Sequence, residues 1–117
     1  MKSLAQWREV LESAPAHTLL VVDFYKTSCG ACRYIQAGFV KLCRASTEDP
    51  TVAFFKHNVM DEFEEKSEIA DELRIRAVPM FCFFRGGKLV DQFATRERKR
   101  VAAAINHHAG HEVLQAS

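Results

Sequence analysis

Residues 19–32 read LLVVDFYKTSCGAC: an apolar run interrupted only by Asp23, a short polar link, and two cysteines separated by two small residues. The apolar run predicts a strand that is buried on both faces, at the centre of a covered sheet. Because the cysteines follow so closely, we expect a tight turn and then a helix that carries Cys29 in its first turn. The stretch therefore predicts a strand–turn–helix unit with a thiol at the start of the helix.

Cys29 and Cys32 have the spacing of a redox-active dithiol. The first N–H groups of a helix lack intrahelical partners and the helix dipole is positive there, so a thiolate at Cys29 is stabilised and becomes a nucleophile near neutral pH. Cys32 lies three positions on and projects from nearly the same face, within reach to close a disulfide. We therefore expect the pair to exchange electrons with other disulfides.

The composition predicts one globular domain without a general affinity for nucleic acid or membrane. The chain has 117 residues, is 48% apolar and carries a net charge of +1 from 16 basic and 15 acidic side chains. Its four cysteines are too few for a secreted disulfide scaffold. The first residues carry charges where a signal peptide has its apolar segment, and no apolar run approaches the ~20 residues of a membrane helix. We expect a domain over residues 1–109, a flexible tail over 110–117, and a monomer in a reducing compartment.

Periodicity along the chain predicts that helices and strands alternate. Ser3 can cap a first helix, which ends before Pro15. An acidic cluster at Asp61, Glu62, Glu64 and Glu65 is expected to open a helix, because acidic groups stabilise a helix start. The expected elements are a helix from residue 4, a strand over 18–25, a helix over 29–45, a strand over 51–59, a helix over 61–73, strands over 80–85 and 89–93, and a helix over 95–107.

This alternation predicts an α/β fold with a mixed, mostly parallel central sheet and helices on both faces. The last two strands are joined by RGGK at residues 85–88, and paired glycines are typical of a tight hairpin turn. The hairpin is expected to add an antiparallel edge to the sheet.

The motifs, taken in order, resemble those of the thioredoxin family, and the similarity covers nearly the whole chain. They are VDFY at 22–25, CGAC at 29–32, Lys56, Val78-Pro79 and RGGK at 85–88. The resemblance implies a thioredoxin fold and reversible thiol–disulfide exchange with protein substrates that carry disulfides or dithiols. It implies no cofactor, and a reductase, glutathione or a peroxiredoxin as electron partner. A narrower similarity to atypical thioredoxin-like proteins of plant and algal plastids implies the chloroplast stroma, with the cytoplasm as the alternative.

The resemblance also assigns catalytic roles. Cys29 matches the attacking cysteine and Cys32 the resolving one. Asp23 matches a buried acid that assists proton movement at the resolving thiol, and Lys56 matches the neighbour of that acid. Independently, an aspartate inside an apolar strand must be paired or have a raised pKa. Lys56, on the neighbouring strand, is the residue that we expect to set that shift.

A substrate-contact surface is implied around the dithiol. Pro79 matches the cis-proline of the family, and the backbone of Val78 before it is expected to hydrogen-bond an extended substrate segment. A proline directly before an apolar run cannot donate to a strand ladder, so it belongs at a strand start. Ser28, Gly30 and Ala31 complete the expected contact surface.

The chain departs from the family pattern near the cysteines. Ser28 stands in place of an aromatic residue, Ala31 in place of a proline, and Ala37 and Gly38 where a helix-kinking proline would fall. Without the proline, the backbone N–H of Ala31 is available to hydrogen-bond a thiolate and favour the reduced form. We therefore expect a dithiol that is more oxidising than that of an ordinary thioredoxin.

Two metal-site hypotheses compete with simpler interpretations. A zinc site would need two further ligands, for which Cys43 and Cys82 are candidates, but both lie in apolar segments and are expected to be buried apolar residues. His107 and His111 are one helical turn apart, as in some metal sites. Together with His108 they are more typical of a solvated helix end.

Two further features leave alternatives open. The basic run of Arg96, Arg98, Lys99 and Arg100 is expected to be a solvated face, with contact to an acidic partner as the alternative. The groove around Pro79 is also compatible with a docking module that binds a partner protein without redox turnover.

Overall fold

The computed structural model describes residues 3–45, 49–60, 65–111 and 113. In these ranges the chain forms four helices and four strands. They are α1 (Leu4–Ser13), β1 (Leu19–Tyr25), α2 (Gly30–Ala45), β2 (Val52–Asn58), α3 (Glu68–Glu72), β3 (Met80–Arg85), β4 (Lys88–Ala94) and α4 (Arg98–Ala109). Apart from α3, each element lies close to its predicted range. None of the helices in the described ranges is both long enough and apolar enough to span a membrane.

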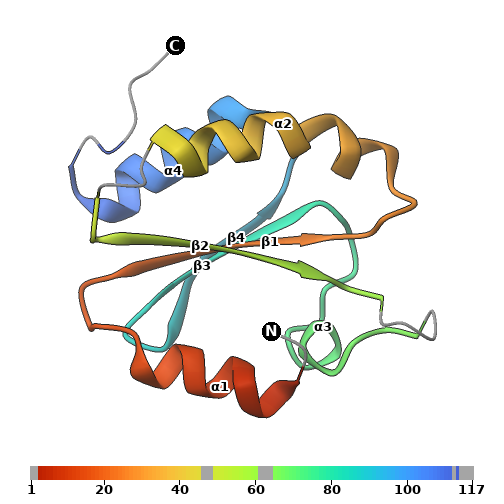
Figure 1. Ribbon diagram of the computed structural model, residues 1–117, viewed down its shortest axis with the longest axis horizontal. Helices are drawn as coiled ribbons and strands as arrows, with labels where there is room; N and C mark the ends of the chain where they lie inside the picture. Colours follow the sequence, from red (N-terminus) through yellow and green to blue (C-terminus); the bar gives the residue numbers. More distant parts are fainter. Residues whose placement is uncertain (1–2, 46–48, 61–64, 112, 114–117) are drawn as a thin grey trace.

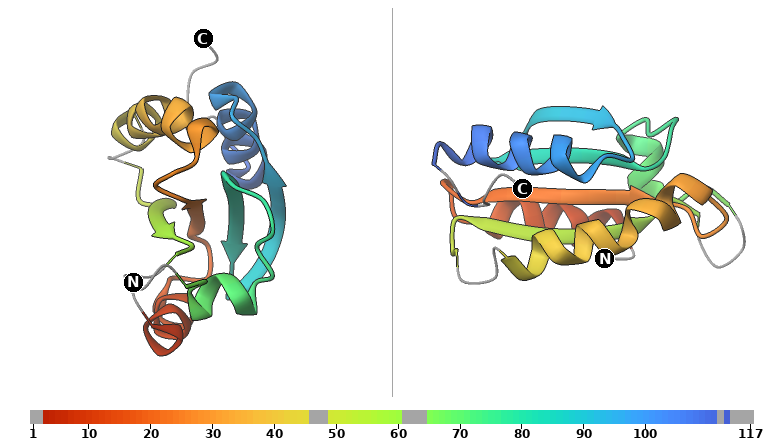
Figure 2. Two further views of the ribbon diagram at one scale, coloured as in Figure 1. Left: turned by 90° about the vertical axis from the view of Figure 1, so that its right-hand side faces the viewer. Right: turned by 90° about the horizontal axis from the view of Figure 1, so that it is seen from above.

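The strands form one sheet in the order β2-β1-β3-β4, so the predicted central strand is indeed internal. Helices α2 and α4 cover one face of this sheet, and α1 and α3 cover the other (Figure 1). Figure 2 shows α2 and α4 running side by side above the strands. The predicted arrangement of a central sheet with helices on both faces is confirmed.

The sheet is mixed as expected, but the prediction that it is mostly parallel is wrong. Only the β1–β2 pair is parallel, whereas β3 runs antiparallel to both β1 and β4. The segment between β2 and β3 does not return the chain along the length of the sheet, so β3 starts at the end at which β2 finished.

Strand β1 is buried on both faces, and alternate side chains enter two separate cores. Leu19 and Val21 pack with residues of α2 and α4. Leu20, Val22 and Phe24 pack with residues of α1 and α3 on the other face. Since side chains alternate along a strand, Asp23 belongs to the face covered by α2 and α4.

The helix expected over residues 61–73 is much shorter than predicted. Asp61, Glu62 and Glu64 lie outside the described residues, and Glu65 precedes the helix without belonging to it. The prediction of a helix at residues 65–67 is therefore wrong.

The helix start at residue 67 is fixed by contacts with the preceding strand. Ser67 donates its N–H to Val59 O at 2.7 Å, and its hydroxyl accepts the N–H of Ala70 as an N-cap. The same hydroxyl is 2.8 Å from Nε2 of the buried His57 on β2. A residue tied to β2 in this way must stay extended, so the helix begins only after it.

The hairpin is confirmed, and both of its glycines adopt left-handed backbone angles, φ +59° at Gly86 and +77° at Gly87. Of the expected tail, residues 110, 111 and 113 are described and the others lie outside the described residues. Gly110 ends α4 in a left-handed conformation. Val113 donates its N–H to Asn106 Oδ1 at 2.8 Å and packs against the α2–α4 core.

We predict that Phe39→Ala lowers the free energy of unfolding by about 3–5 kcal/mol, the usual cost of truncating a buried phenylalanine. Phe39 of α2 is 1% exposed and contacts the rings of Phe54 and Phe81, so the cavity cannot refill from solvent. Urea denaturation measures the change. Tyr34→Ala is the control on the same helix, because Tyr34 is 74% exposed and should change stability by no more than about 0.5 kcal/mol. Equal effects of the two variants would contradict the described core.

Candidate active site

Cys29 caps the start of α2 with its own side chain. Its carbonyl accepts the first helical hydrogen bond, from Arg33 N–H at 3.1 Å, which makes it the N-cap and not a first-turn residue as predicted. Its Sγ accepts the N–H of Cys32 at 3.1 Å. Sulfur thus takes the place of the serine or aspartate oxygen that usually caps a helix. The sulfur therefore faces the positive end of the helix dipole.

The two thiols of the dithiol differ in exposure. All four cysteines are present as thiols; Cys29 is half-buried, whereas Cys32 is only 5% exposed. Burial, followed by the hydrogen bond with Cys29, raises the pKa of the Cys32 thiol to about 12. One sulfur is therefore accessible, and the other needs a base before it can react.

Asp23 is the buried acid next to this pair. Its side chain is 1% exposed, and within the described part of the chain its Oδ1 has no hydrogen-bond partner. Burial raises the pKa of Asp23 from 3.8 to about 6. The charge of Asp23 also helps to raise the pKa of Cys32, which places the carboxylate within electrostatic reach of that thiol.

Lys56 stands beside Asp23 in the register of the parallel pair β1–β2. Its side chain is exposed, and its Nζ lies over the Tyr25 ring, 4.8 Å from the centroid. The positive charge of Lys56 lowers the pKa of Asp23 and opposes the larger effect of burial. The expectation that Lys56 sets the upward shift is therefore wrong: burial raises the pKa, and the lysine limits the rise.

The Val78–Pro79 peptide bond is cis, as the sequence predicted. Pro79 is buried and directly precedes β3. The Cys29 thiol lies 3.8 Å from Val78 O, which brings this backbone to the dithiol from a segment 49 residues away. The Thr95 N–H donates to Pro79 O at 3.3 Å. The backbone of Thr95 is thereby joined to the segment that contacts Cys29.

The remaining predicted contact residues form a rim of small side chains. Ser28 and Gly30 are exposed, and Ala31 is half-buried. The structure thus brings together every residue that the sequence assigned to the site, with Lys56 at its outer edge. Thr95 was not predicted, since a backbone donor leaves no signal in the residue type. Tyr34 was not predicted either, although it falls outside the apolar periodicity of α2 and could have been expected to be exposed.

The other cysteines and histidines do not converge on a common site. Cys43 packs in the core under α2 and α4, whereas Cys82 is buried on the opposite face of the sheet, where burial raises its pKa to about 12. His108 contacts the carboxylate of Asp91 at 2.8 Å, whereas His111 contacts that of Asp49 at 3.0 Å. Among the described residues, no three histidine, cysteine or acidic side chains are grouped so as to hold a metal ion.

Comparison with known proteins gives one consistent result. The family model named Thioredoxin matches residues 2–107. Thioredoxin-like 4, chloroplastic, from Arabidopsis thaliana is 50% identical over 105 residues, 88% of this chain and 52% of its own length. The protein of the same name from Oryza sativa subsp. japonica is 49% identical over 109 residues, 92% of this chain and 51% of its own. The chain thus spans about half the length of these curated relatives.

A solved structure confirms the thioredoxin fold that the family resemblance implied. The crystal structure of Malassezia sympodialis thioredoxin (Mala s 13) superposes with a TM-score of 0.76 at 32% sequence identity. The match covers 93% of this chain and 90% of that one.

We predict that Asp23→Asn raises the free energy of unfolding at pH 7 by about 3 kcal/mol, following the pKa difference between the folded and unfolded states. The folded pKa lies above the unfolded one, so Asp23 binds its proton more tightly in the folded protein. The wild type therefore loses stability as pH rises through the interval from 3.8 to about 6, and the variant should lack this loss. Denaturation midpoints between pH 4 and 8 measure it.

Asp91→Asn is the control of opposite sign. A hydrogen bond from His108 lowers the pKa of Asp91, so its stabilising contribution is present at neutral pH and disappears on acidification. Its removal should lower stability at pH 7. A wild type whose stability rose steadily from pH 4 to pH 6.5, unchanged in Asp23→Asn, would contradict the described burial of Asp23.

Proposed function

The chain belongs to the thioredoxin family, and from this we propose that it is a thiol–disulfide oxidoreductase that exchanges its Cys29–Cys32 dithiol with disulfides of protein substrates. One observation carries the proposal: Cys29 Sγ accepts the N–H of Cys32 at the start of α2, while Cys32 itself is buried. In such a pair one sulfur is accessible to a substrate and the other is buried behind it.

The exchange proceeds in two balanced steps. The Cys29 thiolate attacks one sulfur of the substrate disulfide, forming a mixed disulfide and releasing the other substrate sulfur as a thiolate, which takes up a proton. The Cys32 thiolate then attacks Cys29 Sγ. This forms the Cys29–Cys32 disulfide and releases the second substrate thiolate. Two electrons have passed to the substrate, and a dithiol reductase or glutathione must return them to the protein.

Asp23 is suited to take the proton of Cys32 in the second step. With a pKa near 6 it is mostly a carboxylate at neutral pH, yet it is basic enough to accept a proton as the thiol reacts. Lys56 supports this role because its charge keeps the pKa of Asp23 from rising further. We therefore assign Asp23 as the base and Lys56 as a residue that tunes it.

The substrate chain would lie across the rim made by Ser28, Gly30 and Ala31. The Val78 backbone next to Pro79 is in contact with the attacking sulfur, so an extended segment bonded to this backbone would hold its disulfide at Cys29. The chloroplastic names of the two plant relatives support a location in a plastid, where we place the protein in the stroma.

We also propose that the dithiol is more oxidising than that of an ordinary thioredoxin. The Cys32 N–H already bonds Cys29 Sγ, and Ala31 retains an N–H in the same turn, which a proline would lack. Donors that stabilise a thiolate favour the reduced dithiol and so raise its reduction potential.

We predict that Cys29→Ser abolishes reduction of insulin disulfides, because serine is not a nucleophile toward sulfur, whereas Cys32→Ser stops after the first step and accumulates a mixed disulfide. Precipitation of reduced insulin measures the first effect, and non-reducing electrophoresis with mass spectrometry the second. Cys43→Ser is the matched control, because its thiol packs in the core away from the rim. Retention of full activity by Cys29→Ser would contradict the proposal and favour a docking module.

We predict that Ala31→Pro lowers the reduction potential by about 30–60 mV, the equivalent of the roughly 1.5–3 kcal/mol of one hydrogen bond to a charged group. Equilibration with glutathione redox buffers measures the potential. Ala37→Pro removes an N–H farther along the same helix and is the control. An unchanged potential in Ala31→Pro, or a wild-type potential at or below that of ordinary thioredoxin, would contradict the oxidising character.

A further inference from the structure

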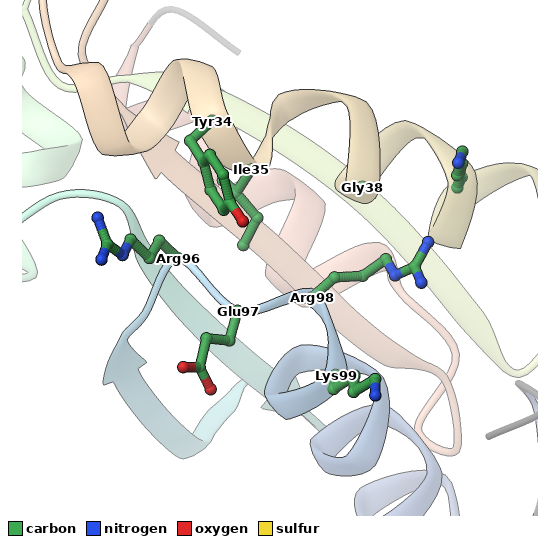
Figure 3. A pocket seen from close by; sticks show the side chains of 8 residues that line it. Tyr34, Ile35, Gly38, Arg96, Glu97, Arg98 and Lys99 are labelled. Atoms are coloured by element: carbon green, nitrogen blue, oxygen red, sulfur yellow. The ribbon is translucent and has the colours of Figure 1, made fainter. Parts of the chain in front are cut away.

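A groove of about 560 Å³ runs between α2 and the start of α4, beside the dithiol. Tyr34, Gly38 and Lys41 line it from α2, and Arg96, Arg98 and Lys99 line it from the opposite side. Figure 3 shows Tyr34 and Gly38 facing this basic segment across the groove. The basic run that the sequence left as a solvated face is therefore one wall of a concave surface.

The groove is strongly cationic, and in the described part of the chain its cations form no salt bridges. Within the described residues, none of Lys41, Arg96, Arg98 and Lys99 takes part in a salt bridge. Glu97 is the acidic residue of the lining, and its carboxylate points away from α2 in Figure 3. The positive potential of the groove is thus available to a ligand.

Two of the arginines are held in place by contacts with α2. The Arg96 guanidinium lies 5.9 Å from the centre of the Tyr34 ring. The aliphatic stem of Arg98 packs so close to Gly38 that a Cβ there would be 3.2 Å from it. Tyr34 itself is 74% exposed and presents its ring to the groove. An ordered cation and an exposed aromatic ring are typical of a contact surface for another protein.

Both walls of the groove are connected to the dithiol through neighbouring residues. Arg96 directly follows Thr95, whose N–H bonds Pro79 O, and the adjoining Val78 O lies 3.8 Å from the Cys29 thiol. On the other wall, Tyr34 follows Cys32 by two positions on the same helix. A substrate segment bonded to the Val78 backbone would therefore continue into the groove.

We propose that this groove binds an acidic segment next to the target disulfide, so that the preferred substrates are proteins whose disulfide is flanked by Asp and Glu. This inference rests on the proposed function and adds the substrate class to it. Carboxylates complement the four cations, and an adjacent side chain can pack on Tyr34. The contacts raise the rate of productive encounter and hold the disulfide at Cys29.

The test uses three synthetic peptides that share one intramolecular disulfide and differ only in whether the flanking residues are acidic, neutral or basic. Second-order rate constants are measured in single turnovers of the pre-reduced protein, so that no electron donor is required. For the wild type we expect the acidic peptide to react about tenfold faster than the neutral one at low salt, and this preference to fade near 1 M NaCl. The basic peptide should be the slowest.

The variants place the effect in the groove. Lys99→Glu should lower the acidic-to-neutral rate ratio about threefold, and Lys41→Glu combined with Lys99→Glu should bring it below one. Lys88→Glu is the matched control, since it changes the net charge as much as Lys99→Glu does. It lies in the exposed hairpin, at the end of β3 remote from Pro79, and should keep the wild-type ratio. Circular dichroism verifies that each variant is folded.

The outcomes separate the two proposals. Equal wild-type rates with the three peptides, or an equal loss of preference in Lys88→Glu and Lys99→Glu, would overturn the proposal that the groove binds acidic segments. The proposed oxidoreductase activity would be unaffected by either result. Failure of the wild type to reduce any of the peptides would overturn both.

Discussion

The molecule depends on the burial of β1 on both faces. A strand in this position is largely apolar, because most of its side chains enter one of two cores. It carries one carboxylate, Asp23, on the face that α2 covers. The same strand ends just before the helix whose start holds Cys29. Burial of one strand therefore determines both where the sulfur lies and in which environment its neighbouring acid titrates.

The buried carboxylate of Asp23 lowers the stability of the fold and, in the proposed mechanism, provides a base for the dithiol. A buried carboxylate with an oxygen lacking a hydrogen-bond partner in the described chain opposes folding at neutral pH. An amide or an aliphatic side chain would avoid this cost, but neither could serve as the base that we propose for Cys32. Lys56 adjusts the balance from the surface, because a charge at the sheet edge lowers the pKa of Asp23 without filling the core. The acid is thus kept within reach of neutral pH by two opposing effects of unequal size.

The sequence predicted the features that depend on neighbouring residues and missed those that depend on contacts between distant segments. Local patterns were sufficient for β1, for α2 and for the glycine hairpin, since periodicity and turn residues act over a few positions. The start of α3 was not predictable in this way, because Ser67 is held by His57 and Val59, partners that the local pattern does not reveal. The direction of β3 likewise depends on its pairing with β1 and β4. The site was assembled from motifs far apart in the chain, and the resemblance supplied their order. Whether Lys56 raises or limits the pKa shift of Asp23 could be decided only once the burial of Asp23 was known.

The groove also depends on segments that are far apart in the sequence. It offers a way for a site whose rim has only small side chains to select substrates. Ser28, Gly30 and Ala31 offer little apolar area around the sulfur, and apolar area is what most contact surfaces use for binding energy. Backbone contacts at Val78 would hold any extended segment and so distinguish few of them. Discrimination must then come from side chains beyond the rim. Tyr34 and the cations facing it adjoin the rim, and they meet only because α2 and α4 pack side by side over one face of the sheet. The proposed selectivity by charge consequently arises from the tertiary structure, as does the proposed proton transfer from Cys32 to the buried Asp23.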